Sequence, residues 1–200
     1  MSSDNRNIVI TSKDRKFLYQ VREVLHLQVK LGRKSRSTEK EKKYSVLQFG
    51  DVCFYQFLQN IGLTKRKSLT LSCLKIPDQY FHDFLRGVID GDGSIQKWRH
   101  ATNGNMQWSL RIVSGSPFFL PWIKGKIKKI MDIDGKIYIV RRSERKNPLY
   151  ILKYGKFAAK VILRICYYNG GLALQRKLKK TMECLQSENG LSKYGIFIGT

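Results

Sequence analysis

The sequence is poor in acidic residues. It has 15 Asp and Glu against 38 Lys and Arg in 200 residues, which gives a net charge of +23 at pH 7. A compact fold with this much charge of one sign repels itself, so we expect a polyanionic partner. Nucleic acid is the first candidate. An anionic membrane surface is a distant third function, because the basic residues fall in predicted hairpins and not on one amphipathic helix.

Long apolar runs and paired cysteines are also lacking. No stretch approaches the ~18 consecutive apolar residues of a membrane span, and the start, MSSDNRNIVI, has no apolar signal core. The three histidines have no ligand spacing, and no C-x-x-C pair occurs among Cys53, Cys73, Cys166 and Cys184. We therefore expect a cytoplasmic protein with reduced thiols, without a disulfide framework or a zinc site.

Two segments of the chain resemble each other. Residues 10–25 and 112–127 match at a constant offset of 102, through the pairs Ile10/Ile112, Ser12/Ser114, Phe17/Phe119, Leu18/Leu120, Val21/Ile123 and Leu25/Ile127. Each copy predicts a strand end, a Ser cap and an amphipathic helix. A β-hairpin with a charged tip and a second helix follow in both copies.

The second copy has a preface that the first copy lacks. Residues 77–111 predict a helix and two strands, whereas only seven residues precede Ile8. We therefore expect a partial repeat without this helix over residues 1–76 and a complete domain over residues 77–200. The last 14 residues, 187–200, have no clear period and are interpreted as a tail.

The helix in the preface combines an apolar stripe with glycines and acids. Its stripe follows the spacing i, i+3, i+4, i+7, i+8 and consists of Phe81, Phe84, Leu85, Val88 and Ile89. Gly87 and Gly91 lie four residues apart, which lets another backbone approach closely. Asp90 and Asp92 lie at the predicted C-terminus, where the helix dipole disfavours carboxylates unless a cation is present.

Residues 85–93, Leu-Arg-Gly-Val-Ile-Asp-Gly-Asp-Gly, resemble the LAGLIDADG signature of the homing endonucleases. Seven of the nine positions are identical or conservatively replaced, and Arg86 and Gly91 depart from it. The resemblance implies an α+β fold, with an αββαββα domain on an antiparallel saddle-shaped sheet, preceded here by a partial copy. In that family two motif helices pack side by side, and the packing positions here are Gly87, Val88, Asp90 and Gly91.

The resemblance also implies a site for metal-dependent hydrolysis of phosphodiester bonds in double-stranded DNA. Asp92 is the acid that binds the metal and serves catalysis, and the Gly91 carbonyl is a further oxygen ligand. Mg²⁺ suits such an oxygen site. Asp90 is expected to cap and orient the turn. A lysine tunes the attacking water in this family, and Lys153 and Lys156 are both candidates.

Strand alternation predicts which side chains face DNA. The family resemblance selects Gln96, Trp98 and His100 on the first strand, and the polar face of the second carries Gln107, Ser109 and Arg111. On the third strand the DNA side carries Lys136 and Tyr138. The hairpin tips are expected to contact phosphates through Arg33, Lys34, Arg36, Arg141 and Arg142, and Arg176, Lys177, Lys179 and Lys180 extend this footprint.

One motif supplies one carboxylate, whereas cutting both strands of DNA needs two sites. The helix of residues 78–92 could pair with its copy in a homodimer, another polypeptide could supply the absent helix, or the chain could bind without cutting. Two hypotheses follow. The first is a homing endonuclease tied to mobile introns, and the second is a non-cleaving relative that acts as a DNA-binding module or an RNA-splicing maturase.

Overall fold

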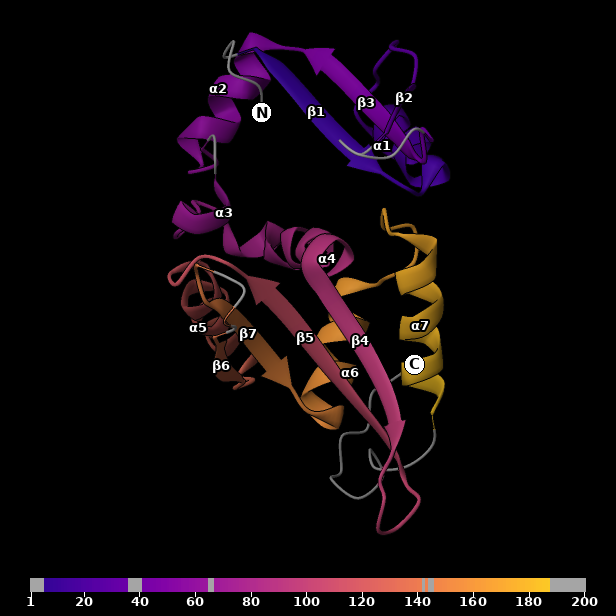
Figure 1. Cartoon of the computed structure of the whole chain (residues 1–200), viewed down its shortest axis with the longest axis vertical. Coiled ribbons are helices and arrows are strands. Elements are labelled where there is room, and N and C mark those ends of the chain that lie inside the picture. Colours follow the sequence, from indigo (N-terminus) through magenta and orange to yellow (C-terminus); the bar gives the residue numbers. More distant parts are fainter. Residues whose placement is uncertain (1–5, 36–40, 65–66, 142, 144–145, 188–200) are drawn as a thin grey trace.

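The computed structural model describes residues 6–35, 41–64, 67–141, 143 and 146–187. The first lobe contains a three-stranded antiparallel sheet in the order β1-β3-β2. Its elements are β1 (Asn7–Ser12), α1 (Arg15–Val24), β2 (Gly32–Lys34), β3 (Tyr44–Gly50) and α2 (Val52–Asn60). The short helix α3 (Lys67–Thr70) lies in the segment that leads to the second lobe (Figure 1).

The second lobe contains a four-stranded antiparallel sheet in the order β4-β5-β7-β6. Its elements are a 3₁₀ turn η1 (Asp78–Tyr80), α4 (Phe81–Asp92), β4 (Gly93–Arg99), β5 (Met106–Ser114), α5 (Phe119–Met131), β6 (Lys136–Val140), β7 (Leu149–Tyr154), α6 (Lys156–Cys166) and α7 (Gln175–Gln186). The motif helix α4 lies on the side of this lobe that faces the first lobe (Figure 1).

The two lobes share an order of elements. The series β1–α1–β2–β3–α2 in the first lobe corresponds to β5–α5–β6–β7–α6 in the second. The strand orders also correspond, since β1-β3-β2 matches β5-β7-β6. Within the described residues, α4 and β4 have no counterpart in the first lobe.

Each lobe has its own hydrophobic core. In the first lobe the core contains Ile8, Leu18, Val21, Leu47, Phe49 and Tyr55. In the second lobe α5 and α6 pack on one face of the sheet, which we call the helix-covered face and which carries Ile95, Trp108, Leu110, Ile112, Leu152 and Tyr154. Figure 1 views this sheet with α5 and α6 behind the strands, so the reader looks onto the opposite, uncovered face.

Two local features differ from the sequence-based expectation. The N-cap of α1 is Asp14 and not Ser12, because the Asp14 carboxylate accepts a hydrogen bond from the Phe17 amide at 3.2 Å. Ser12 supports this cap by accepting from the Asp14 amide at 3.0 Å. Helix α7, which we did not predict, packs against α6 and β4 and buries Lys177, Thr181 and Cys184.

The start of the second lobe is attached to α5 by charge. Asp78 in η1 accepts hydrogen bonds from Lys126 and Lys129, and these lower the pKa of Asp78 to about 2. The contact joins the segment before α4 to a helix of the core, so it helps to fix where the motif helix begins. Within the described part of the chain, no helix has the length and apolar character to cross a membrane.

Candidate nucleic-acid interface

The motif helix is held from one side by the connection between α6 and α7. Asp90 is buried and accepts hydrogen bonds from the Tyr167 hydroxyl at 2.6 Å and the Leu174 amide at 2.9 Å. Burial raises the pKa of the Asp90 carboxyl, against the opposing effect of these two hydrogen bonds. Asp90 therefore positions the α6–α7 connection, which corrects the expectation that it caps the turn of its own helix.

Arg86, one of the two departures from the motif, holds the same connection. Its guanidinium donates to the carbonyl oxygens of Leu172 and Cys166 at 2.7 and 2.8 Å, and to the Asp83 carboxylate at 2.6 Å. Gly171 leaves room for this group, since a Cβ there would lie 2.7 Å from Nη1 of Arg86. The large cation at this position satisfies carbonyls that the connection brings beside α4.

The remaining side of α4 is open. Gly87 and Gly91 are exposed, and a Cβ added to either would meet nothing within 4 Å. Val88 is half-buried and packs against the core of the second lobe. Of the four predicted packing positions, the two glycines thus face open space, whereas Val88 and Asp90 contact their own lobe.

Asp92 ends α4 next to the first strand of the sheet. It is exposed, and the Gly93 carbonyl beside it accepts a hydrogen bond from the ammonium group of Lys177. Burial contributes most to lowering the pKa of Lys177, while Asp90 and Asp92 act in the opposite direction. Lys177 is buried and supports the end of α4. This corrects the expectation that Lys177 extends the DNA footprint.

A row of cations crosses the uncovered face of the sheet. The row consists of three successive cross-strand partners, Arg111 on β5, Lys153 on β7 and Lys136 on β6. The uncharged Ser94 on β4, which pairs with Arg111, continues the row. Like charges on directly opposed positions are destabilising, by amounts of up to ~1 kcal/mol per pair. Nε of Arg111 is buried and has no hydrogen-bond partner among the described residues. The row therefore presents positive charge that an external anion would neutralise.

The structure separates the two candidate catalytic lysines. Lys153 lies in the cationic row, and its ammonium group is 6.0 Å from the ring centroid of Trp98, which is 40% exposed. Lys156 begins α6, and its charge acts on Lys160 of α6 and Cys184 of α7. Of the two, Lys153 is the residue on the uncovered face.

The predicted DNA-facing residues of β4 and β5 share the uncovered face, but they differ in exposure. Gln96, paired with Ser109, and Gln107, paired with Trp98, are partly exposed. Ser109 has 0% exposure, which leaves no surface for the direct contact that we predicted. A hollow of about 590 Å³ runs along β4, and its lining includes Gln96, Trp98, Arg111 and Lys180.

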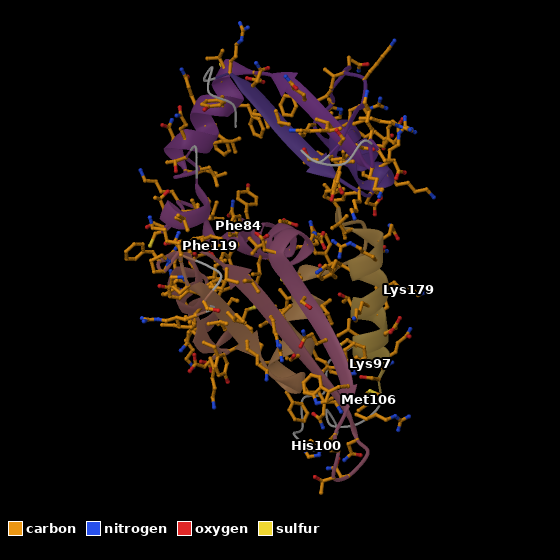
Figure 2. The ribbon with its side chains drawn as sticks, in the orientation of Figure 1. Phe84, Lys97, His100, Met106, Phe119 and Lys179 are labelled. Carbon is orange, nitrogen blue, oxygen red and sulfur yellow. The ribbon has the colours of Figure 1, made fainter. Side chains whose placement is uncertain are left out.

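Other predicted contacts lie nearer the ends of the sheet. Tyr138 on β6 is 46% exposed, and its strand neighbour Lys136 is also exposed. His100 follows β4 at the hairpin, far from Phe84 and Phe119, which lie at the end near the first lobe (Figure 2). Arg141 follows β6 and is exposed. Arg142 lies outside the described residues.

In the first lobe, Arg33 and Lys34 lie on opposite faces of the sheet. Lys34 pairs with Tyr44, whose ring also lies 5.4 Å from the ammonium group of Lys13. Arg33 pairs with Ser45, which is buried on the helix-facing side. Lys34 therefore lies on the open face and Arg33 on the helix-facing side, and the phosphate contacts of both residues stay predictions. Arg36 is outside the described residues.

Solved structures identify this arrangement of lobes. The chain superposes on mesophilic variants of the homing endonuclease I-DmoI with a TM-score of 0.57 and 12% identity, over 88% of this chain and 83% of that one. The N-terminal LAGLIDADG domain of DUF199/WhiA gives 0.51 and 17% over 92% and 79%. The chain has the LAGLIDADG fold. No family profile and no curated protein matches the sequence.

The likeness to LAGLIDADG structures extends over most of the chain. The homing endonuclease I-GzeII in complex with its DNA target gives a TM-score of 0.51 and 11% identity, over 92% of this chain and 81% of that one. Full-length DUF199/WhiA from Thermatoga maritima gives 0.51 and 15% over 96% of this chain, which spans 58% of that protein. At these identities the likeness establishes the fold. The residues must support any function by themselves.

Proposed function

We propose that the chain binds double-stranded DNA on the uncovered face of the β4-β5-β7-β6 sheet. The observation that carries the proposal is the row of Arg111, Lys153 and Lys136, which concentrates positive charge where no helix of the described residues covers the strands. Phosphate contacts of this kind supply most of the affinity of a basic protein for DNA.

The neighbouring side chains favour duplex DNA over other polyanions. A two-stranded antiparallel ribbon fits the major groove, where amide side chains such as Gln96 and Gln107 can read base edges. Two structures of the same fold, I-DmoI with Ca and I-GzeII, were solved in complex with DNA. RNA is a lesser candidate, because the deep, narrow major groove of A-form RNA does not admit such a ribbon.

The position of Asp92 favours a second function, the metal-dependent hydrolysis of DNA. The exposed carboxylate lies at the C-terminal end of α4, where the helix dipole and the Gly91 carbonyl both favour a cation. The described residues contain no cluster of three His, Cys, Asp or Glu side chains that could hold a metal. A single carboxylate, that of Asp92, with the Gly91 carbonyl beside it fits Mg²⁺, because this ion commonly binds one or two carboxylates together with water and phosphate oxygens.

In this proposal Mg²⁺ supplies the activation of water and the stabilisation of the leaving oxygen. The residues of the chain orient the duplex: the cationic row holds phosphates, and Asp92, the last residue of α4, comes two residues before Ser94, which continues that row on β4. One carboxylate serves one strand. A second chain paired through α4, as a homodimer, would supply a second Asp92.

Asp92→Asn separates the two functions. We expect wild type and variant to bind a long duplex equally in EDTA, within about twofold, because the substitution leaves the cationic row intact. With Mg²⁺, we expect wild type to cut a library of duplexes and the variant to lose at least about 100-fold in rate, as one metal-binding charge is removed. Gel assays of both reactions on the same samples provide the measurement.

The outcomes distinguish the alternatives. Scission that persists in Asp92→Asn would contradict the catalytic role of Asp92. Binding without scission in wild type would leave a DNA-binding module and reject the endonuclease. Weak binding in wild type that does not change with salt would reject both.

A further inference from the structure

The two lobes face each other across a groove. Its volume is about 890 Å³, and its walls include residues 10–17 of the first lobe and Gly87, Asp90 and Gly91 of α4. Among the described residues, no helix or strand of the first lobe packs extensively against a helix or strand of the second. Other segments must therefore fix how the two lobes lie relative to each other.

The segment that links the lobes forms one attachment between them. The Lys75 amide donates a hydrogen bond to the Ile61 carbonyl at 2.9 Å, which holds this segment against the end of α2. The ammonium group of Lys126 on α5 donates to the Ile76 carbonyl at 3.1 Å, which holds the same segment against the second lobe. This attachment lies on the side of α2 and α3, at the left in Figure 1.

The connection between α6 and α7 forms a second attachment, on the side of α7 at the right in Figure 1. Leu172 in this connection packs against the hydrophobic core of the first lobe. Among the described residues, it is the one hydrophobic residue of the second lobe that does so. The next residue, Ala173, belongs to the core of the second lobe. Two adjacent residues thus contact two different cores.

The motif helix holds the backbone on both sides of Ala173. The Arg86 guanidinium donates to the Leu172 carbonyl at 2.7 Å, and the Asp90 carboxylate accepts from the Leu174 amide at 2.9 Å. Arg86 and Asp90 lie four residues apart on α4, so both groups are on one side of the helix. Leu172 therefore extends into the first lobe from a backbone that cannot shift without breaking a hydrogen bond to α4.

We propose that Leu172 is a positioning residue that fixes the first-lobe sheet relative to the β4-β5-β7-β6 sheet. Its functional consequence rests on the proposed binding of DNA. The open face of the first lobe carries Lys34 and the ammonium group of Lys13 beside Tyr44. With the first lobe held in place, these cations and the cationic row contact the same duplex. A fixed separation raises the affinity, because the second contact becomes intramolecular once the first has formed.

Distances between two spin labels test the positioning role without DNA. Cysteines that carry the labels replace Glu23 on α1 and Lys128 on α5, which are both exposed, and serines replace the exposed Cys53 and Cys73. We expect a narrow distance distribution in this parent protein. In Leu172→Ala the distribution should be at least about twice as wide, because the truncated side chain leaves a gap at the first-lobe core.

Leu58 provides the matched control. It is also partly buried against the first-lobe core, but it lies on α2 within that lobe. Leu58→Ala removes the same atoms from the same core, and we expect it to leave the width of the distance distribution unchanged. Leu172→Met keeps most of the apolar volume and should give the distribution of the parent protein.

A double-mutant cycle tests the coupling to DNA binding. Glutamine at Lys13 and Lys34 is expected to lower the affinity of the wild type for a long duplex about tenfold. In Leu172→Ala the same two glutamines should cost less than about threefold, because the first lobe no longer holds these positions against the duplex. In Leu58→Ala they should still cost about tenfold.

Three results would overturn the proposal. The first is a distance distribution in Leu172→Ala as narrow as that of the parent protein. The second is equal broadening in Leu58→Ala, which would assign the effect to a general weakening of the first-lobe core. The third is an undiminished effect of the two glutamines in Leu172→Ala. A wild type that binds no duplex would reject the proposed function instead, and the distance distributions would still decide the role of Leu172.

Discussion

Replacing Arg111, Lys153 and Lys136 together by glutamine is expected to lower the affinity for duplex DNA on the order of 100-fold at about 0.1 M salt. The three side chains form one cross-strand row, so the variant removes adjacent phosphate contacts. Each contact contributes about 0.9 to the slope of log K against log salt, so the slope should fall by about 3. Anisotropy titrations over a series of KCl concentrations give both quantities.

The control has the same loss of charge elsewhere. Glutamine at Lys124, Lys128 and Arg164 removes three cations from α5 and α6, the helices on the other face of the sheet. We expect its slope to stay within about 1 of wild type. Equal losses in the two triple variants would mean that net charge, and not this face, determines DNA binding.

Arg86→Ala is expected to lower the free energy of unfolding by about 3 kcal/mol. The guanidinium is buried, and its removal leaves the carbonyls of Leu172 and Cys166 without their donor and Asp83 without its ion pair. Urea denaturation followed by circular dichroism measures the change.

Arg164→Ala serves as the comparison for this variant. Arg164 lies on α6 and is exposed, so its loss should cost less than about 0.5 kcal/mol. Arg86→Lys should fall between the two, because an ammonium group keeps the charge but cannot reproduce the planar fork. A cost for Arg86→Ala as small as that of Arg164→Ala would show that the connection holds α4 by other contacts.

The sequence predicted the parts of the structure that depend on local patterns. The alternation along β5 placed Trp108, Leu110 and Ile112 on the helix-covered face, where the structure has them. The apolar stripe predicted the motif helix, whose regular part runs over Phe81–Asp92. These features depend on periods of two and 3.6 residues, which a sequence displays directly.

Contacts between distant segments could not be predicted in this way. Two of the three hydrogen-bond partners of Arg86 lie 80 and 86 residues further along the chain, and those of Asp90 lie 77 and 84 residues away. Ser109 lies on the expected face, yet it is fully buried, and alternation along a strand predicts the face of a side chain but not its exposure. Lys153 lies on the sheet and Lys156 on a helix because β7 ends at Tyr154. The ends of helices and strands are the features that a sequence predicts least well.

Neighbouring residues on β6 test most directly whether the uncovered face binds DNA. Tyr138 and Ile139 are 46% and 60% exposed and, as neighbours on a strand, point to opposite faces. A photoreactive benzoylphenylalanine is placed at either position, and cross-linking to a bound duplex is measured after irradiation. The account predicts a strong cross-link from position 138 and at most a tenth of that yield from 139. Equal yields, or a stronger cross-link from 139, would contradict it.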